Sequence, residues 1–133
     1  MGCDIHAYIV TNDNKIISID LARSYELFGV LFNVRQEHSD NICSDLNNIK
    51  SELLQIKTDN NAFKRDILDE NNIDNHSHCY CTLIDIGNWL VRWLARGPHS
   101  DRKLSKDVVK RIEDLSDKMI ENNAKYFICS FDN

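Results

Sequence analysis

Proline and glycine are scarce in this chain: its 133 residues contain one proline, Pro98, and four glycines. Sandwiches and barrels built from many short strands need these residues at their turns, so the scarcity favours long helices. Apolar residues make up 42% of the chain and charged residues 28%, which is typical of a globular protein rather than a disordered one. At this length we expect a single domain over residues 1–133.

Long apolar runs and an excess of basic charge are also missing. No run of 18 apolar residues occurs, and no basic segment leads into an apolar one at the start, so we expect no membrane contact and a cytoplasmic location. The net charge of -5 and pI near 5.4 argue against binding to extended nucleic acid, which needs a basic face. A small anionic ligand needs only two or three arginines.

Paired cysteine motifs and the common catalytic motifs are absent as well. There is no CxxC pair, no glycine-rich phosphate loop and no GxSxG motif. Five cysteines remain, and we interpret them as buried free thiols of a cytosolic protein: Cys3, Cys43, Cys79, Cys81 and Cys129. Zinc held by Cys79 and Cys81 with His76 and His78 is disfavoured, because these ligands are too crowded for the usual spacing.

Hydrophobic periodicity predicts the order of the elements. Strands are expected at 3–10, 15–19 and 125–131, and helices at 21–33, 42–57, 62–68, 83–95 and 105–122, with a polar loop at 69–81. These elements predict an α+β fold. A three-stranded antiparallel sheet, made from the N-terminal hairpin and the C-terminal strand, would pack against four to five helices. If strand 125–131 lies beside strand 3–10, the two chain ends meet.

The first strand carries two polar residues on one face. Because strand side chains alternate, Asp4 and His6 share the face of Tyr8 and Val10, with about 6–7 Å between successive residues on that face. At this spacing the two side chains could bind one metal ion or one substrate group together. The alternative is a solvent-exposed face on which both are ordinary surface residues.

A second pair, His76 and His78, repeats the spacing of two in the asparagine-rich segment. Histidine is the commonest metal ligand and titrates nearest to neutral pH. A site with an open position, made by His6, His76, His78 and a carboxylate such as Asp4, is therefore our preferred metal hypothesis, for a divalent ion such as zinc or manganese. Asp132 follows an apolar strand and offers a further carboxylate.

Two arginines and two tryptophans could also take part in ligand binding, but each has a structural interpretation as well. Arg23 and Arg35 flank the helix at 21–33 and would suit a phosphate, although each could form a surface ion pair instead. Trp89 and Trp93 are four residues apart on the helix at 83–95, which indicates core packing or an oligomer contact rather than a platform for stacking bases.

Four segments resemble a family of short phage and prophage proteins: MGCDIHAYIV, ARSYELFGVLFNVR, DNHSHCYCTLIDI and the terminal FDN. The chain departs from the family pattern at Asn33, where a glycine is expected, and at Cys79 and Cys81, where serine and an apolar residue are expected. The resemblance implies a phage origin and a site, but no particular reaction. By motif position that site comprises Asp4, His6, Arg23, Arg35, Asp74, His76, His78 and Asp132.

Two classes of function follow from these residues. The first is a small phage-encoded hydrolase, a phosphodiesterase acting on a nucleotide or cyclic nucleotide signal. A metal-bound water or a pair of histidines would cleave the bond while an arginine holds the phosphoryl oxygen, and loss of the signal would counter host defence. The second is a non-catalytic module: a sponge that sequesters such a nucleotide, or an inhibitor of a host protein. Either would act in the bacterial cytoplasm, and either is compatible with a homo-oligomer.

Overall fold

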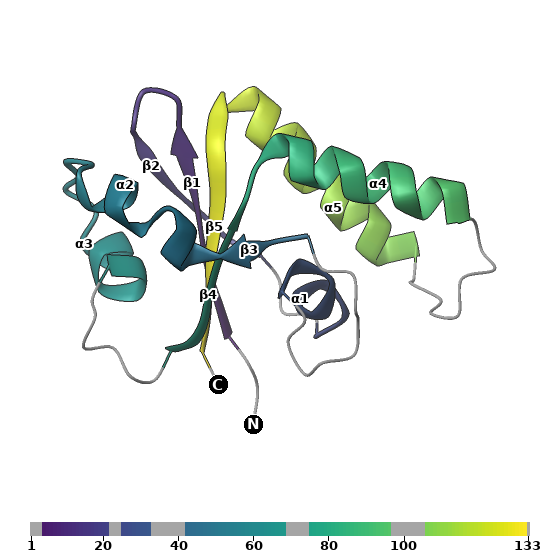
Figure 1. Cartoon of the computed structure of the whole chain (residues 1–133), viewed down its shortest axis with the longest axis horizontal. Helices are drawn as coiled ribbons and strands as arrows, with labels where there is room; N and C mark the ends of the chain where they lie inside the picture. The colour runs from purple at the N-terminus through teal and green to yellow at the C-terminus, as the bar shows by residue number, and fades with distance from the viewer. Residues whose placement is uncertain (1–3, 22–24, 33–41, 69–74, 97–105, 133) are drawn as a thin grey trace.

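A five-stranded antiparallel sheet forms the centre of the computed structural model, which describes residues 4–21, 25–32, 42–68, 75–96 and 106–132 (Figure 1). The strands are β1 (Asp4–Thr11), β2 (Ile16–Ile19), β3 (Ser44–Asp45), β4 (Asn75–Cys81) and β5 (Ala124–Asp132). Their order is β2-β1-β5-β4-β3, so the last strand in sequence is the central one. The predicted α+β class and the pairing of the first strand with the C-terminal strand are both confirmed.

The predicted number of strands was wrong. Residues 75–81 form β4, which pairs with β5, although the polar composition of this segment predicted a loop. In the sequence, His78 and Tyr80 alternate with Cys79 and Cys81, which is a pattern compatible with a strand. Whether such a segment pairs as a strand is decided by burial against its neighbours rather than by intrinsic preference. β3 is a two-residue edge strand beside β4, too short for any periodicity to predict.

Helices cover both faces of the sheet (Figure 1). One face, called here the α4 face, carries α1 (Tyr25–Phe32), α4 (Leu83–Arg96) and α5 (Lys106–Glu121), and all three helices lie where the sequence predicted them. The other, called the α2 face, carries short elements: η2 (Leu46–Asn48), α2 (Lys50–Leu54), α3 (Asn61–Phe63) and the π-helical turn η3 (Lys64–Leu68). Within the described helices, none is both long and apolar enough to span a membrane.

The single helix predicted over 42–57 is also wrong. Ile42 and Cys43 are buried in the core of the α4 face, whereas Leu46 and Leu53 are buried in the core of the α2 face. The chain passes around the edge of the sheet between them, and β3 makes the crossing. One straight helix cannot place its apolar stripe in two cores on opposite sides of a sheet. The segment therefore forms the short strand β3 and two short helices, η2 and α2, instead of one long helix.

The central strands are buried on both faces. In β1, Ala7 and Ile9 belong to the α4-face core while Tyr8 and Val10 belong to the α2-face core, as the predicted alternation requires. In α4, Trp89 is buried in the α4-face core and Trp93 packs against it, which confirms the core interpretation. The homo-oligomer stays a prediction.

Helix α4 begins with a reciprocal cap. The Thr82 backbone N–H donates to Asp85 Oδ2 at 2.9 Å, and the Asp85 N–H donates to Thr82 Oγ1 at 3.2 Å. Thr82 and Asp85 therefore form a capping box, with aspartate in place of the usual glutamate, and it satisfies two N–H groups that a helix start leaves without partners.

Replacing either member of this box should destabilise the protein. We expect Thr82→Ala and Asp85→Ala each to lower the free energy of unfolding by about 1 kcal/mol, measured by urea denaturation. The double variant should lose less than the sum, because both changes remove the same interaction. Ser51→Ala, at an exposed position of α2, is the control. Strictly additive losses would contradict the reciprocal cap.

Candidate functional site: histidines around a buried aspartate

Asp66 is a buried carboxylate on the α2 face of the sheet, with 5% of its surface exposed. The Tyr8 hydroxyl of β1 donates to Asp66 Oδ2 at 2.6 Å, and Arg65 Nε donates to Asp66 Oδ1 at 3.0 Å. The His6 ring, two residues before Tyr8 on the same strand, places Nδ1 3.5 Å from Asp66 Oδ2. Three side chains therefore compensate the cost of burying this charge.

These contacts keep Asp66 ionised. Burial by itself raises the pKa of the Asp66 carboxyl, but hydrogen bonds from Arg65 and Tyr8 and the attraction of His6 outweigh it, and the pKa is lowered below its usual value. Burial and the hydrogen bond to Asp66 raise the pKa of the Tyr8 hydroxyl well above its usual value. At neutral pH the pair is a carboxylate and a neutral phenol that donates to it.

The backbone of Asp66 holds the second histidine. Nε2 of His78, on β4, lies 2.9 Å from the Asp66 carbonyl oxygen. A carbonyl can only accept, so His78 donates from Nε2, and the neutral ring carries its lone pair on Nδ1. Burial lowers the pKa of His78, which favours this neutral form. Asp66 lies on the π-helical turn η3, and such turns are rare and often occur at functional sites.

The two histidines lie in one row across the sheet. His6 of β1 and His78 of β4 are both in register with Ser130 of the central strand β5. Neighbouring strands are about 4.8 Å apart, so the backbones of the two histidines are separated by roughly 10 Å. Ser130 is fully buried between them, and its Oγ has no hydrogen-bond partner within the described part of the chain.

The structure places the predicted residues as follows. His6 and His78 come from strands that are not neighbours, yet both contact Asp66. The β1 and β5 backbones set Asp4 directly opposite Asp132. The side chains of Asp4, His76 and Asp132 lie outside the described residues, as do Arg23, Arg35 and Asp74 entirely. Their membership of the site stays a prediction.

Sequence analysis did not identify four residues of this site. They are Tyr8, Arg65, Asp66 and Ser130. One signal was present: Asp66 falls three residues after Phe63 and one before Ile67, on the stripe that a helix over 62–68 would bury. A carboxylate on a buried stripe needs partners, so it indicates a polar site. No comparable signal pointed to Ser130, whose neighbours are set only by the strand order.

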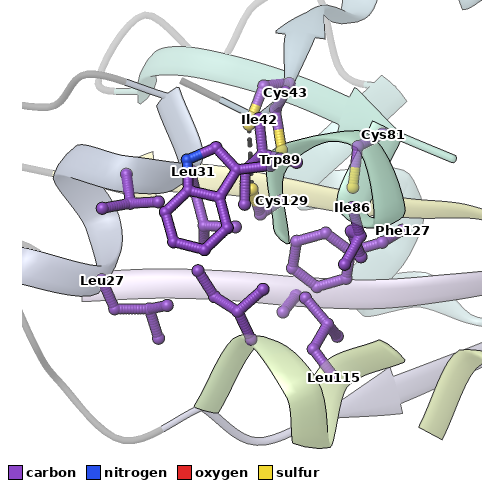
Figure 2. Close-up of a cluster of buried hydrophobic side chains, with 14 of the residues drawn as sticks. Leu27, Leu31, Ile42, Cys43, Cys81, Ile86, Trp89, Leu115, Phe127 and Cys129 are labelled. Atoms are coloured by element: carbon purple, nitrogen blue, oxygen red, sulfur yellow. Dashed lines mark hydrogen bonds between the residues drawn. The ribbon is translucent and has the colours of Figure 1, made fainter. Parts of the chain in front are cut away.

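A metal ion could be held elsewhere, by cysteines on the α4 face. Among the described side chains, Cys43, Cys79 and Cys129 form the group whose ligand atoms all lie within 4.8 Å of one another. All three thiols are buried and free, which confirms the predicted state of these cysteines. Figure 2 shows Cys43, Cys81 and Cys129 among the apolar side chains of the core that also contains Trp89. The predicted metal site at Asp4, His6, His76 and His78 is not tested by this arrangement.

The sheet separates this thiol cluster from the histidines. His78 and Cys79 are consecutive in β4 and therefore face opposite sides, so zinc held jointly by Cys79, Cys81 and His78 is excluded by strand geometry, in agreement with its low ranking from spacing. Burial raises the pKa of Cys43 and of Cys79. At Cys129 burial acts in the same direction, but hydrogen bonds from Cys43 and Cys79 outweigh it and lower the pKa, so a thiolate is best stabilised there.

The hydrogen bond from Tyr8 to Asp66 should contribute more to the free energy of unfolding than a comparable hydrogen bond in an exposed position. Tyr8→Phe removes a donor from a buried carboxylate, and we expect the free energy of unfolding to fall by about 1.5–3 kcal/mol. Tyr126→Phe is the matched control, because the Tyr126 hydroxyl donates to Glu52 at the same 2.6 Å in an exposed position. We expect less than about 0.5 kcal/mol there. Equal losses in urea denaturation would show that burial adds nothing to the Tyr8–Asp66 hydrogen bond.

His78 should make stability depend on pH below neutrality. Its folded pKa is lower than the unfolded value of 6.5, so as pH falls through 6.5 the unfolded chain takes up a proton before the folded chain does. Stability therefore falls from about pH 7 toward the lower folded pKa. In His78→Gln this part of the slope should be missing, which parallel urea titrations at several pH values would measure. Identical slopes for the two proteins would rule out the assignment.

Comparison of the chain with protein-family models, with curated proteins and with solved structures gives no match. The function has therefore to be argued from the geometry and chemistry of Asp66 and its partners.

Proposed function

We propose that the histidine site around Asp66 is a general acid–base site that cleaves a phosphodiester in a nucleotide or cyclic nucleotide. One observation carries the proposal: the imidazoles of His6 and His78 come from separate strands and are both anchored by the same buried residue. Anchoring costs stability when it buries a charge, and a protein accepts that cost most often at a functional site.

The two histidines have different surroundings and take different roles. His78 is held neutral, with Nε2–H bound to the Asp66 carbonyl, so its Nδ1 lone pair is the general base that accepts a proton from water or a ribose hydroxyl. His6 lies beside the Asp66 carboxylate, which compensates the charge of an imidazolium, and it is the general acid that protonates the leaving oxygen. The side chain of His6 is 34% exposed, so solvent and ligand reach it.

A cation next to the site supports an anionic substrate. The Arg65 side chain is 66% exposed while its Nε binds Asp66, so its guanidinium lies at the surface next to the residue that both histidines contact. Guanidinium groups bind phosphoryl oxygens well. The net charge of -5 repels long polyanions, which favours a small nucleotide over extended nucleic acid.

The remaining predicted residues extend the same proposal. Arg23 and Arg35 would add cations for the phosphate, and Asp74 would contact the ligand. A divalent ion held by Asp4, His6, His76 and His78, zinc or manganese, would activate the attacking water in place of a histidine base. The protein would act in the cytoplasm of a bacterial cell, during phage infection or from a prophage, where removing a nucleotide signal counters antiviral defence.

The test is turnover of a nucleotide panel. Purified protein is incubated with linear and cyclic nucleotides, with and without Mn²⁺ or Zn²⁺, and the products are identified by mass spectrometry. We expect catalytic turnover that falls by about 10²-fold or more in His6→Gln and in His78→Gln, because each removes one proton-transfer group. Asn88→Ala, exposed on α4 across the sheet, is the control and should keep full activity.

Two outcomes would overturn hydrolysis. If the protein captures a nucleotide stoichiometrically and releases it intact on denaturation, it is the sponge rather than an enzyme. If no nucleotide is bound or changed, neither nucleotide function holds, and inhibition of a host protein is the alternative that is left.

A further inference from the structure

Four of the five cysteines gather at one place in the α4-face core. Cys43 precedes β3, Cys79 and Cys81 lie on β4, and Cys129 lies on β5. Cys79 and Cys129 are direct partners in neighbouring strands, and their sulfurs are 2.9 Å apart. Cys43 Sγ lies within 4.8 Å of the sulfurs of both Cys79 and Cys129. All four are almost completely buried.

Isolated buried cysteines behave as small apolar residues and do not need one another. Here three sulfurs lie within 4.8 Å of one another, and they come from segments that are far apart in the sequence. Zinc–sulfur bonds of about 2.3 Å in a tetrahedron place the sulfurs roughly 3.8 Å apart. The observed sulfur separations run from 2.9 Å, between Cys79 and Cys129, to at most 4.8 Å, and this range includes the separation that one thiophilic ion requires.

We propose that Cys43, Cys79 and Cys129 bind one Zn²⁺ ion. Cys81 lies outside this 4.8 Å group, but it shares the β4 face and the core of Cys79 and is the candidate fourth ligand. Thiolate ligands favour zinc over harder cations, and four protein ligands make a closed site of the structural kind. Each thiol that binds as a thiolate releases its proton to solvent, so zinc affinity rises with pH. The divalent cation offsets the thiolate charge that the apolar core would otherwise exclude.

A disulfide between Cys79 and Cys129 is the competing interpretation. It would need the two sulfurs to approach from 2.9 Å to about 2.05 Å, and it would use only two of the thiols. A disulfide would leave Cys43 without a role in the cluster, whereas one metal ion would bind Cys43 together with Cys79 and Cys129. The number of convergent thiols therefore favours zinc.

The proposed ion would fix the position of the chain where it crosses the sheet edge. Cys43 follows Ile42, whose backbone N–H donates to Val30 of α1, and two residues later the chain has left the α4 face. Binding Cys43 to β4 and β5 through zinc fixes where this crossing occurs. The site lies on the opposite face from Asp66, so its failure would leave the proposed hydrolase function standing, and the reverse also holds.

The first experiment measures metal in the unmodified protein. The chain is produced in medium supplemented with zinc, purified under reducing conditions and analysed by elemental mass spectrometry. We expect about one zinc per chain. A mercurial reagent that blocks thiols should release this zinc, as detected by a chromogenic chelator. Replacement by Co²⁺ should give the intense charge-transfer absorption of thiolate-bound cobalt.

Single substitutions then identify the ligands. Cys43→Ser, Cys79→Ser and Cys129→Ser should each lose most of the zinc, whereas Cys3→Ser, at the fifth cysteine, should keep it. Release of zinc by the mercurial reagent and the thiolate–cobalt absorption of the unmodified protein decide the question even if a variant fails to fold, because zinc held by histidines and carboxylates would show neither.

The proposal is overturned if the unmodified protein holds no zinc, either as purified or after refolding with excess zinc, and shows no thiolate–cobalt absorption. A Cys79–Cys129 disulfide in peptide mass spectra of that zinc-free protein would identify the competing interpretation as the correct one.

Discussion

The burial of strand β5 on both faces is the constraint on which the rest of this structure depends. Phe127, Ile128, Cys129 and Ser130 are completely buried, so the strand needs a hydrogen-bonded neighbour on each side and a layer of side chains above and below. β1 and β4 supply the neighbours, α4 and α5 cover one face, and the segment from η2 to η3 covers the other. The chain must therefore cross the sheet edge at β3 before this segment begins.

Because of this constraint, two rows of side chains at adjacent register positions lie on opposite faces of the sheet, and each row contains polar or reactive groups. In one register position His6, Ser130 and His78 form a row toward the α2 face. In the next, Ala7, Cys129 and Cys79 form a row toward the α4 face. Because strand side chains alternate, consecutive residues of β4 and β5 contribute to different sites, a histidine site on one side and a thiol cluster on the other. The two proposed sites are thus physically separate although both use strands β4 and β5.

The histidine site also explains an otherwise costly feature of the α2 face. A carboxylate on the buried side of η3 loses hydration, and Tyr8, Arg65 and His6 replace it. The π-helical turn directs the Asp66 carbonyl to His78 as well. One residue therefore orients two imidazoles through its side chain and its backbone. Such an arrangement fixes ring orientation and tautomer, which general acid–base chemistry requires.

The sequence by itself determined the long elements with regular periodicity, which are β1, β5, α4 and α5, because their patterns are local. It also indicated His6 and His78 as residues of interest. Only the tertiary structure decided that 75–81 is a strand, that the stripe from Ile42 to Leu53 divides between two cores, and that Asp66 joins the histidines. Those outcomes depend on contacts between residues far apart in the chain, and no local pattern encodes which distant partner a half-buried segment will meet.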